Sequence, residues 1–83
     1  MLKVVFFASL KERLASEGEV LEKPGHVTTV GELVTFLLQQ NSHWVGILDA
    51  QNIRTACDHE ICDADTPLNG DEEVAFFPPV TGG

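Results

Sequence analysis

The stretch TVGELVTFLLQQ, residues 29–40, decides the fold, because it carries the strongest helix signal in the chain. Glu32 follows Thr29 at the spacing of a capping box, in which two side chains satisfy the free N–H groups at the start of a helix. The apolar positions of the stretch repeat at helical spacing and form one face: Val30, Leu33, Val34 and Leu37. Since this face must be buried, the rest of the chain has to supply a layer that covers it.

Short runs of β-branched and aromatic residues lie on both sides of the helix and predict that this layer is a sheet. The expected strands cover residues 3–7, 19–22, 53–57, 60–62 and 73–77. Residues 44–52 follow no clear pattern, and we expect an irregular connection with room for a short helix or strand. The order of elements predicts an α+β fold in which one main helix lies across a mixed sheet.

A shorter helix is predicted between the first two strands. Ser9 and Glu12 repeat the capping-box spacing, so this helix is expected to begin at Ser9. It should bury two leucines of the same face, Leu10 and Leu14. Gly18 is expected to end the helix, because glycine is the commonest residue just after a helix.

Length and charge restrict the classes of function. A chain of 83 residues builds one domain with one core, which leaves little room for a deep cleft and disfavours an enzyme that works alone. Acidic residues outnumber basic ones 13 to 5, and the net charge of −8 repels phosphate backbones and anionic lipids. We therefore expect no nucleic-acid and no membrane partner. A basic protein surface is the electrostatic complement, although solubility alone explains the charge equally well.

The cysteines are expected to be reduced thiols of a cytoplasmic protein. No apolar run approaches the roughly 20 residues that cross a bilayer, and nothing in the sequence signals export. Cys57 and Cys62, with His59 between them, match no structural zinc pattern, so we expect packing residues and no metal. A structural role, at the surface or half buried, is expected for His26, His43 and Trp44.

The end of the chain differs from the rest. Pro78 and Pro79 cannot donate ladder hydrogen bonds, so the last strand should stop before them. This divides the chain into a domain, residues 1–77, and a flexible, extended C-terminal tail, residues 78–83. From Pro79 to its end the tail reaches at most about 16 Å. Because Gly82 and Gly83 have no side chains, they can enter a narrow channel in a partner.

Two segments resemble the molybdopterin synthase small subunit family: residues 3–8, KVVFFA, and residues 70–83, GDEEVAFFPPVTGG. The resemblance in element order covers the whole chain. It implies a ubiquitin-like β-grasp fold and a role as a sulfur carrier in molybdenum cofactor synthesis. Gly83 would then be adenylated, converted to a thiocarboxylate, and donate sulfur to cyclic pyranopterin monophosphate to build the molybdopterin dithiolene. Thr81 and Gly82 would thread the tail into the partner.

The resemblance also implies partners, and no permanently bound cofactor. An E1-like adenylating enzyme would use ATP to activate the tail, and a sulfur donor protein would supply the sulfur. Two large and two small subunits would form the synthase heterotetramer. The catalytic groups are expected in the large subunit, so this chain is not itself an enzyme. Two alternatives stay open. One is a thiamine-pathway sulfur carrier, although the stretch FFPPVT, residues 76–81, argues against it. The other is a ubiquitin-like protein modifier.

Two aromatic residues next to the tail are candidates for the partner interface. Strand alternation places Phe7 and Phe77 on the face opposite Phe6 and Phe76, away from the core. If the first and last strands are neighbours, as in ubiquitin-like folds, these two residues form an exposed apolar patch at the root of the tail. The expected interface also includes three residues of the tail, Pro78, Pro79 and Val80.

Overall fold

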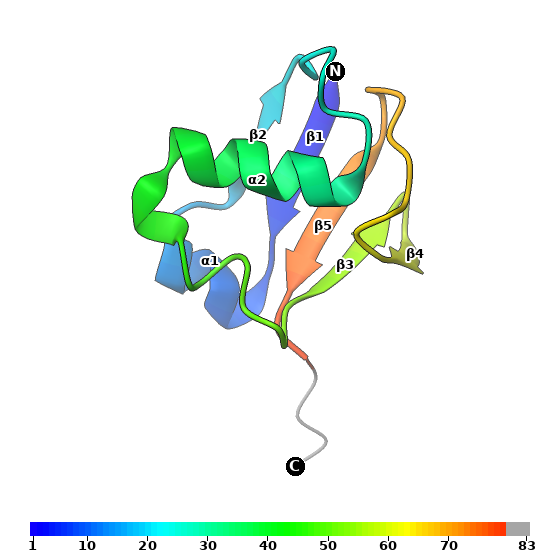
Figure 1. Ribbon diagram of the computed structural model, residues 1–83. Helices are drawn as coiled ribbons and strands as arrows, with labels where there is room; N and C mark the ends of the chain where they lie inside the picture. The colour runs from blue at the N-terminus through cyan, green and yellow to red at the C-terminus, as the bar shows by residue number, and fades with distance from the viewer. Residues whose placement is uncertain (80–83) are drawn as a thin grey trace.

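The main helix lies across one face of a single sheet in the computed structural model, which describes residues 1–79 (Figure 1). Within these residues the sheet has five strands: β1 (Leu2–Phe6), β2 (Gly18–Leu21), β3 (Arg54–Cys57), β4 (Glu60–Cys62) and β5 (Glu73–Phe77). Their order across the sheet is β2-β1-β5-β3-β4. The neighbours β1 and β5 run parallel, whereas the other pairs are antiparallel. This mixed sheet with one main helix confirms the predicted α+β class.

The main helix, α2 (Val30–Gln40), begins where the sequence predicts. The Thr29 hydroxyl accepts a hydrogen bond from the backbone N–H of Glu32 at 3.2 Å. The Glu32 carboxylate accepts in turn from Thr28, from its hydroxyl at 2.6 Å and its backbone N–H at 2.8 Å. These hydrogen bonds lower the pKa of the Glu32 carboxyl, and the bond from the Thr28 hydroxyl has the largest effect. The predicted apolar face is buried at Val30, Leu33 and Leu37.

Gly31 lies in the first turn of α2, where glycine costs a helix up to about 1 kcal/mol relative to alanine. Its backbone N–H donates to the carbonyl of Ala64 at 2.9 Å. A Cβ at position 31 would lie 3.2 Å from both the Cβ and the carbonyl oxygen of Ala64. The glycine thus lets the loop between β4 and β5 pack against the start of α2.

The predicted cap of the first helix at Ser9 is wrong. The helix α1 (Ala8–Leu14) begins one residue earlier, and its N-cap is Phe7, whose side chain makes no capping hydrogen bond. The predicted first strand is correspondingly too long by Phe7. β1 runs into α1 without a loop, and the backbone of Ala8, with φ +56°, makes the change of direction. The helix still buries its predicted leucines, Leu10 and Leu14.

Gly18 opens β2 and does not end α1. Ala15 ends the helix in a left-handed conformation, φ +54°, and its N–H donates to the Glu12 carbonyl at 3.1 Å. At Gly18, φ is +123°, and a Cβ would lie 2.0 Å from the carbonyl oxygen of Val4. The second strand therefore starts one residue earlier than predicted, because only glycine permits this approach to β1.

Trp44 belongs to the core, and the expectation that it lies at the surface or half buried is wrong. It ends the short 3₁₀ helix η1 (Ser42–Trp44), which the sequence left open, and is only 5% exposed. Its ring packs edge-on against Phe6 with centroids 5.2 Å apart. Its indole N–H donates to the carbonyl of Leu14 at 3.1 Å, so the polar atom of this large side chain is satisfied inside the core.

The hairpin of β3 and β4 confirms the predicted strands at this end of the sheet. Asp58 and His59 join the strands with φ of +49° and +71°, the left-handed pair that a tight two-residue hairpin turn requires.

In the part of the chain that the structure describes, no helix is long and apolar enough to cross a membrane.

Candidate functional site at the root of the tail

The last strand, β5, lies in the middle of the sheet and ends at Phe77, as predicted. The chain leaves the sheet beyond this residue, at the end shown lowest in Figure 1. Pro78 and Pro79 continue outside the strand and are half buried. The other predicted tail residues lie outside the described residues: Val80, Thr81, Gly82 and Gly83. The described part of the site is thus the root of the tail.

Phe7 lies beside this root and is exposed, as predicted. Its backbone is extended, with φ −117° and ψ 157°, and its N–H donates to the carbonyl of Phe76 at 3.1 Å. Its side chain is 49% exposed, whereas that of Phe6, one residue earlier, is 1% exposed. The extended backbone therefore places the ring of Phe7 on the outer face of the sheet, away from α2.

Phe77 shares this face but is less exposed than expected. It follows Phe76, which is 1% exposed in the core and aligns with Phe6 across the parallel strands. Alternation therefore directs Phe77 outward, yet its side chain is half buried. The two residues differ in exposure because of their positions. Phe77 belongs to β5, which has a neighbouring strand on each side, whereas Phe7 lies beyond the end of β1.

The apolar surface extends along the outer face of the sheet across four strands, β1, β5, β3 and β4. Val5 aligns with Ala75, Ala75 with Ala56, and Ala56 with Ile61. Ile61 is 73% exposed at the edge of the sheet. This row was not predicted from the sequence, although the alternation of β4 places Ile61 opposite its half-buried neighbour Cys62. We call this face the outer patch, defined by Val5, Phe7, Ala56, Ile61, Ala75 and Phe77. Phe7 and Ile61 are exposed, Ala56 is buried, and the other three are half buried.

The end of the sheet away from the tail is charged. The Glu73 carboxylate forms an ion pair there with the Lys3 ammonium at 3.6 Å, and it lies 3.8 Å from Nε2 of His59, which pairs with it only when protonated. In the preceding turn, burial acts to raise the pKa of the Glu72 carboxyl. The N–H donors of Asn69 and Gly70 outweigh this effect and hold that pKa below its ordinary value. This group of charges therefore lies at the end of the sheet opposite the root of the tail.

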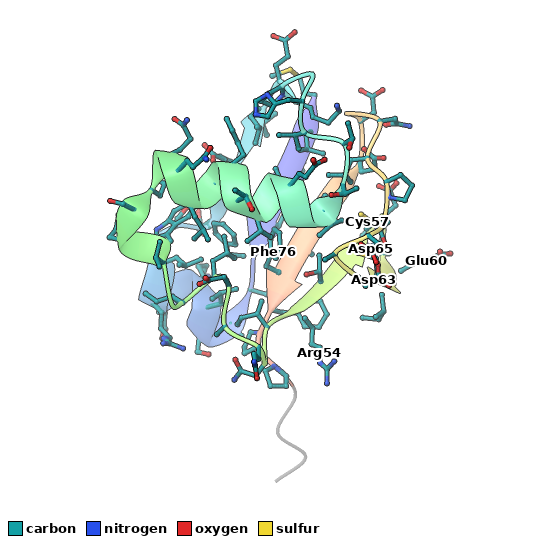
Figure 2. The ribbon with its side chains drawn as sticks, viewed as in Figure 1. Arg54, Cys57, Glu60, Asp63, Asp65 and Phe76 are labelled. Carbon is teal, nitrogen blue, oxygen red and sulfur yellow. The ribbon has the colours of Figure 1, made fainter. Side chains whose placement is uncertain are left out.

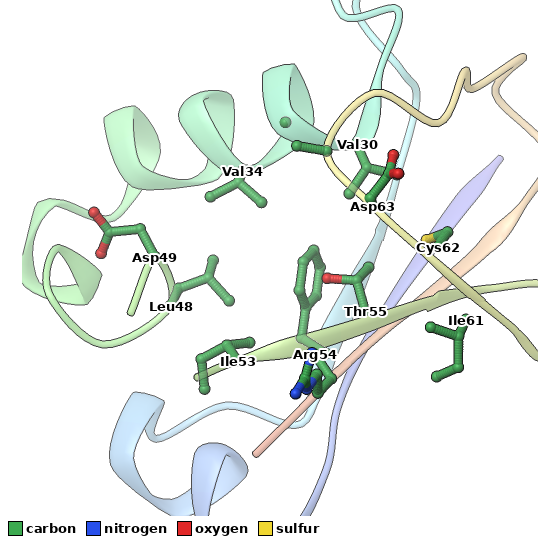
Figure 3. A pocket seen from close by; sticks show the side chains of 13 residues that line it. Val30, Val34, Leu48, Asp49, Ile53, Arg54, Thr55, Ile61, Cys62 and Asp63 are labelled. Carbon is green, nitrogen blue, oxygen red and sulfur yellow. The ribbon is translucent and has the colours of Figure 1, made fainter. Parts of the chain in front are cut away.

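A cleft of about 400 Å³ lies beside the root, between α2 and the hairpin of β3 and β4 (Figure 3). Its apolar lining includes Val30, Val34, Leu48, Ile53 and Phe76. Asp49, Arg54 and Asp63 add charge to its lining. This mixture offers no buried, converging set of polar groups for a small molecule, so we treat the cleft as part of the surface around the root.

The cysteines face the core side of the hairpin and are free thiols. Burial, and then the neighbouring thiol of Cys62, raise the pKa of Cys57 to about 12. A thiol with this pKa stays protonated at neutral pH and is a poor nucleophile and a poor metal ligand. Among residues 1–79, no cluster of three or more His, Cys, Asp or Glu side chains is arranged to hold a metal ion.

Known proteins match this chain along its length. The model of the ThiS family matches residues 4–83, which includes the tail. The molybdopterin synthase sulfur carrier subunit of Escherichia coli (strain K12) is 35% identical over 83 residues, which is 100% of both chains.

Solved structures share the fold, although their sequences have diverged further. The crystal structure of small archaeal modifier protein 1 from Haloferax volcanii has a TM-score of 0.80 at 24% identity, over 99% of this chain and 98% of that one. A second structure is the complex of subunits 1 and 2 of molybdopterin-converting factor from Helicobacter pylori 26695. Its matching chain has a TM-score of 0.67 at 23% identity, over 99% of this chain and 97% of that one. These likenesses confirm the ubiquitin-like β-grasp fold. The chain is thus a member of the ThiS family, and its full-length relative from Escherichia coli is a molybdopterin synthase sulfur carrier subunit.

Proposed function

We propose that this protein is the sulfur carrier subunit of a molybdopterin synthase and that Gly83 is its reacting residue. The observation that carries the proposal is the full-length match at 35% identity to a protein of that name, together with a family match that extends to residue 83. The site geometry supports it, because the chain leaves the centre of the sheet beside an exposed apolar surface. A carrier needs this arrangement, since its domain must dock while its end reaches into a partner.

The chemistry of the tail needs activation by a partner. A carboxylate is a poor electrophile, so an E1-like enzyme first transfers AMP from ATP to Gly83 and releases pyrophosphate. Sulfide-level sulfur delivered by a donor protein then attacks the acyl carbon, the bond to AMP breaks, and a thiocarboxylate remains. Its sulfur attacks cyclic pyranopterin monophosphate, and water then cleaves the bond between the sulfur and the acyl carbon, which returns Gly83 to the carboxylate. Two such rounds supply the two sulfurs of the dithiolene. ATP is used by the activating enzyme, and the thiocarboxylate is the modified form of this chain.

The catalytic groups belong to the partners. Around the described root of the tail the outer patch is apolar, and the Cys57 thiol is protonated at neutral pH because its pKa is raised to about 12. A basic pocket in the large subunit would attract the thiocarboxylate and stabilise its charge. We infer a heterotetramer of two large and two small subunits in the cytoplasm. Subunits 1 and 2 of the Helicobacter pylori factor form a complex, which supports a large-subunit partner for this chain.

The outer patch is the proposed docking surface for both the activating enzyme and the large subunit. Phe7 and Phe77 form its aromatic part, and Pro78 and Pro79 adjoin it at the root of the tail. We also assign Val80, which lies outside the described residues, to the interface. The tail reaches only about 16 Å from Pro79, so each partner has to contact the domain close to the root. Both partners therefore compete for the same face.

Protein modification is the alternative, and the structural neighbour from Haloferax volcanii is named a small archaeal modifier protein. Its identity of 22 to 24% shows the fold alone. The same adenylated glycine would be captured by an amine in a modifier and by sulfur in a carrier. Immunoblots of the native host under denaturing, reducing conditions should therefore show the free protein and no abundant ladder that depends on Gly83.

Intact-mass analysis tests the proposed function directly. Protein that is incubated with the activating enzyme, ATP and a sulfur source should exchange one oxygen for one sulfur at Gly83. The variant that lacks Gly83 should fold normally and transfer no sulfur. Complete absence of the sulfur-containing species from the full-length chain, or normal synthase activity of the deletion variant, would refute the proposal.

A further inference from the structure

Arg54 places a positive charge at the root of the tail. It opens β3 and aligns with Phe77, the last residue of β5. Figure 2 shows its exposed side chain at the end of the sheet from which the chain leaves. Arg54 shares the outer face with Ala56, two residues further along β3. The guanidinium therefore borders the outer patch next to the tail.

This charge has no acidic partner among residues 1–79. The ion pairs found there use the N-terminal ammonium, Lys3 and His59. Asp49 lines the same cleft as Arg54, but its carboxylate accepts a hydrogen bond from the backbone N–H of Gly46 at 2.6 Å. Lys11, Arg13 and Lys23 form no ion pair among these residues either, so the missing pair does not by itself single out Arg54. Its position at the root, beside the tail that enters the partner, suggests that the partner group comes from outside the chain.

We infer that Arg54 forms an ion pair with an Asp or Glu side chain of the large subunit, at the entrance of the pocket that receives the tail. The inference rests on the proposed function. Under the proposed function the tail's own carboxylate is not the partner, because Gly83 reacts inside the pocket of the large subunit, up to about 16 Å beyond Pro79. Arginine is enriched in protein interfaces, and its planar guanidinium binds a carboxylate through two parallel hydrogen bonds.

The pair would fix the orientation of the complex. A chain with a net charge of −8 is attracted by a basic partner over its whole surface, and this attraction alone selects no particular orientation. At Arg54 the signs are reversed, because the carrier supplies the cation and the partner supplies the carboxylate. In other orientations this carboxylate would face acidic residues of the carrier and be repelled. The orientation that places the tail root at the pocket entrance is therefore favoured.

Binding of the cognate large subunit to matched variants tests this inference, by calorimetry at low and high salt. Arg54→Gln should bind about 10-fold more weakly and Arg54→Glu about 100-fold more weakly. Lys3→Gln is the control, because it removes the same charge from the other end of the outer face and loses only an exposed ion pair. It should change the affinity by less than about threefold. All variants should keep the melting temperature of the wild type, since Arg54 is exposed.

A charge-reversal screen locates the carboxylate. Each Asp and Glu around the tail pocket of the large subunit is replaced by Arg, and one replacement should restore binding of Arg54→Glu. Equal affinities for Arg54→Gln and Lys3→Gln, or a screen without any restoring replacement, would overturn the inference. If the wild-type chain itself fails to bind the large subunit, the proposed function is wrong, and the two failures are thereby distinguished.

Discussion

The backbone N–H of Phe7 donates to the carbonyl of Phe76 at 3.1 Å, so the parallel ladder between the first and last strands continues one residue beyond β1. This bond holds Phe7 beside the last strand just before Ala8 turns the chain into α1 at φ +56°. The exposed ring thus has a fixed backbone at the root of the tail, which is a suitable anchor for a partner.

Replacement of Phe7 by Asp should weaken binding to both the activating enzyme and the large subunit. A charge in a desolvated apolar contact should cost roughly 2 kcal/mol of binding free energy if Phe7 is a central anchor. Thermal stability should fall far less than for Phe6→Asp, because the Phe6 side chain is 1% exposed and that of Phe7 is 49% exposed. Phe77→Asp should weaken binding similarly and cost more stability, because Phe77 is half buried.

Competition between the partners provides the complementary measurement. Labelled carrier bound to the large subunit should be released by excess activating enzyme without ATP. A stable ternary complex, or normal binding of Phe7→Asp and Phe77→Asp to both partners, would contradict a shared outer patch.

Gly18→Ala should destabilise the domain by more than about 2 kcal/mol, or prevent folding, because its Cβ would clash with backbone. The carbonyl oxygen of Val4 would lie 2.0 Å from that Cβ, and φ is +123°. Gly25→Ala is the matched control, since no heavy atom lies within 4 Å of its Cβ position. Denaturant titration of both variants checks the prediction, and equal midpoints would refute it.

Trp44→Phe should lower the free energy of unfolding by about 1 to 3 kcal/mol, because it leaves the carbonyl of Leu14 without its indole donor. The smaller ring keeps an aromatic contact with Phe6. Val45→Ala is a suitable control, because the neighbouring Val45 side chain is 60% exposed. Urea unfolding measures both effects, and an unchanged stability of Trp44→Phe would show that the buried hydrogen bond contributes little.

Cys57 should make the domain less stable at alkaline pH. Its pKa is about 12 in the folded state against an ordinary value of 9.0, so the unfolded chain loses this proton first. The unfolded state then binds fewer protons, and stability falls as the pH rises from about 9 towards 12. Cys57→Ala should reduce this loss of stability. Melting temperatures of the two proteins between neutral and alkaline pH give the comparison, and parallel curves would contradict the assignment.

Local patterns were sufficient for several elements. The helix from Val30 to Gln40 follows from its apolar spacing and its Thr29 cap, and β5 ends at Phe77 because two prolines follow it. Where the predictions were wrong, a contact between distant segments decided the outcome. Gly18 is required by the carbonyl of Val4 in the neighbouring strand, and Trp44 is buried because Leu14 supplies an acceptor for its indole.

The sequence by itself determined the α+β class, the main helix, the last strand and the family resemblance of the tail, because each depends on neighbouring residues and on the backbone limits of proline and glycine. Only the tertiary structure decided which side chains share the outer face. Ile61 joins the apolar row through the alignment of β3 with β4, and Arg54 reaches the tail root through the alignment of β3 with β5. The local turn at Asp58 and His59 fixes the register of β3 with β4. The alignment of β3 with β5 joins segments that lie far apart in the chain, and no local pattern specifies it.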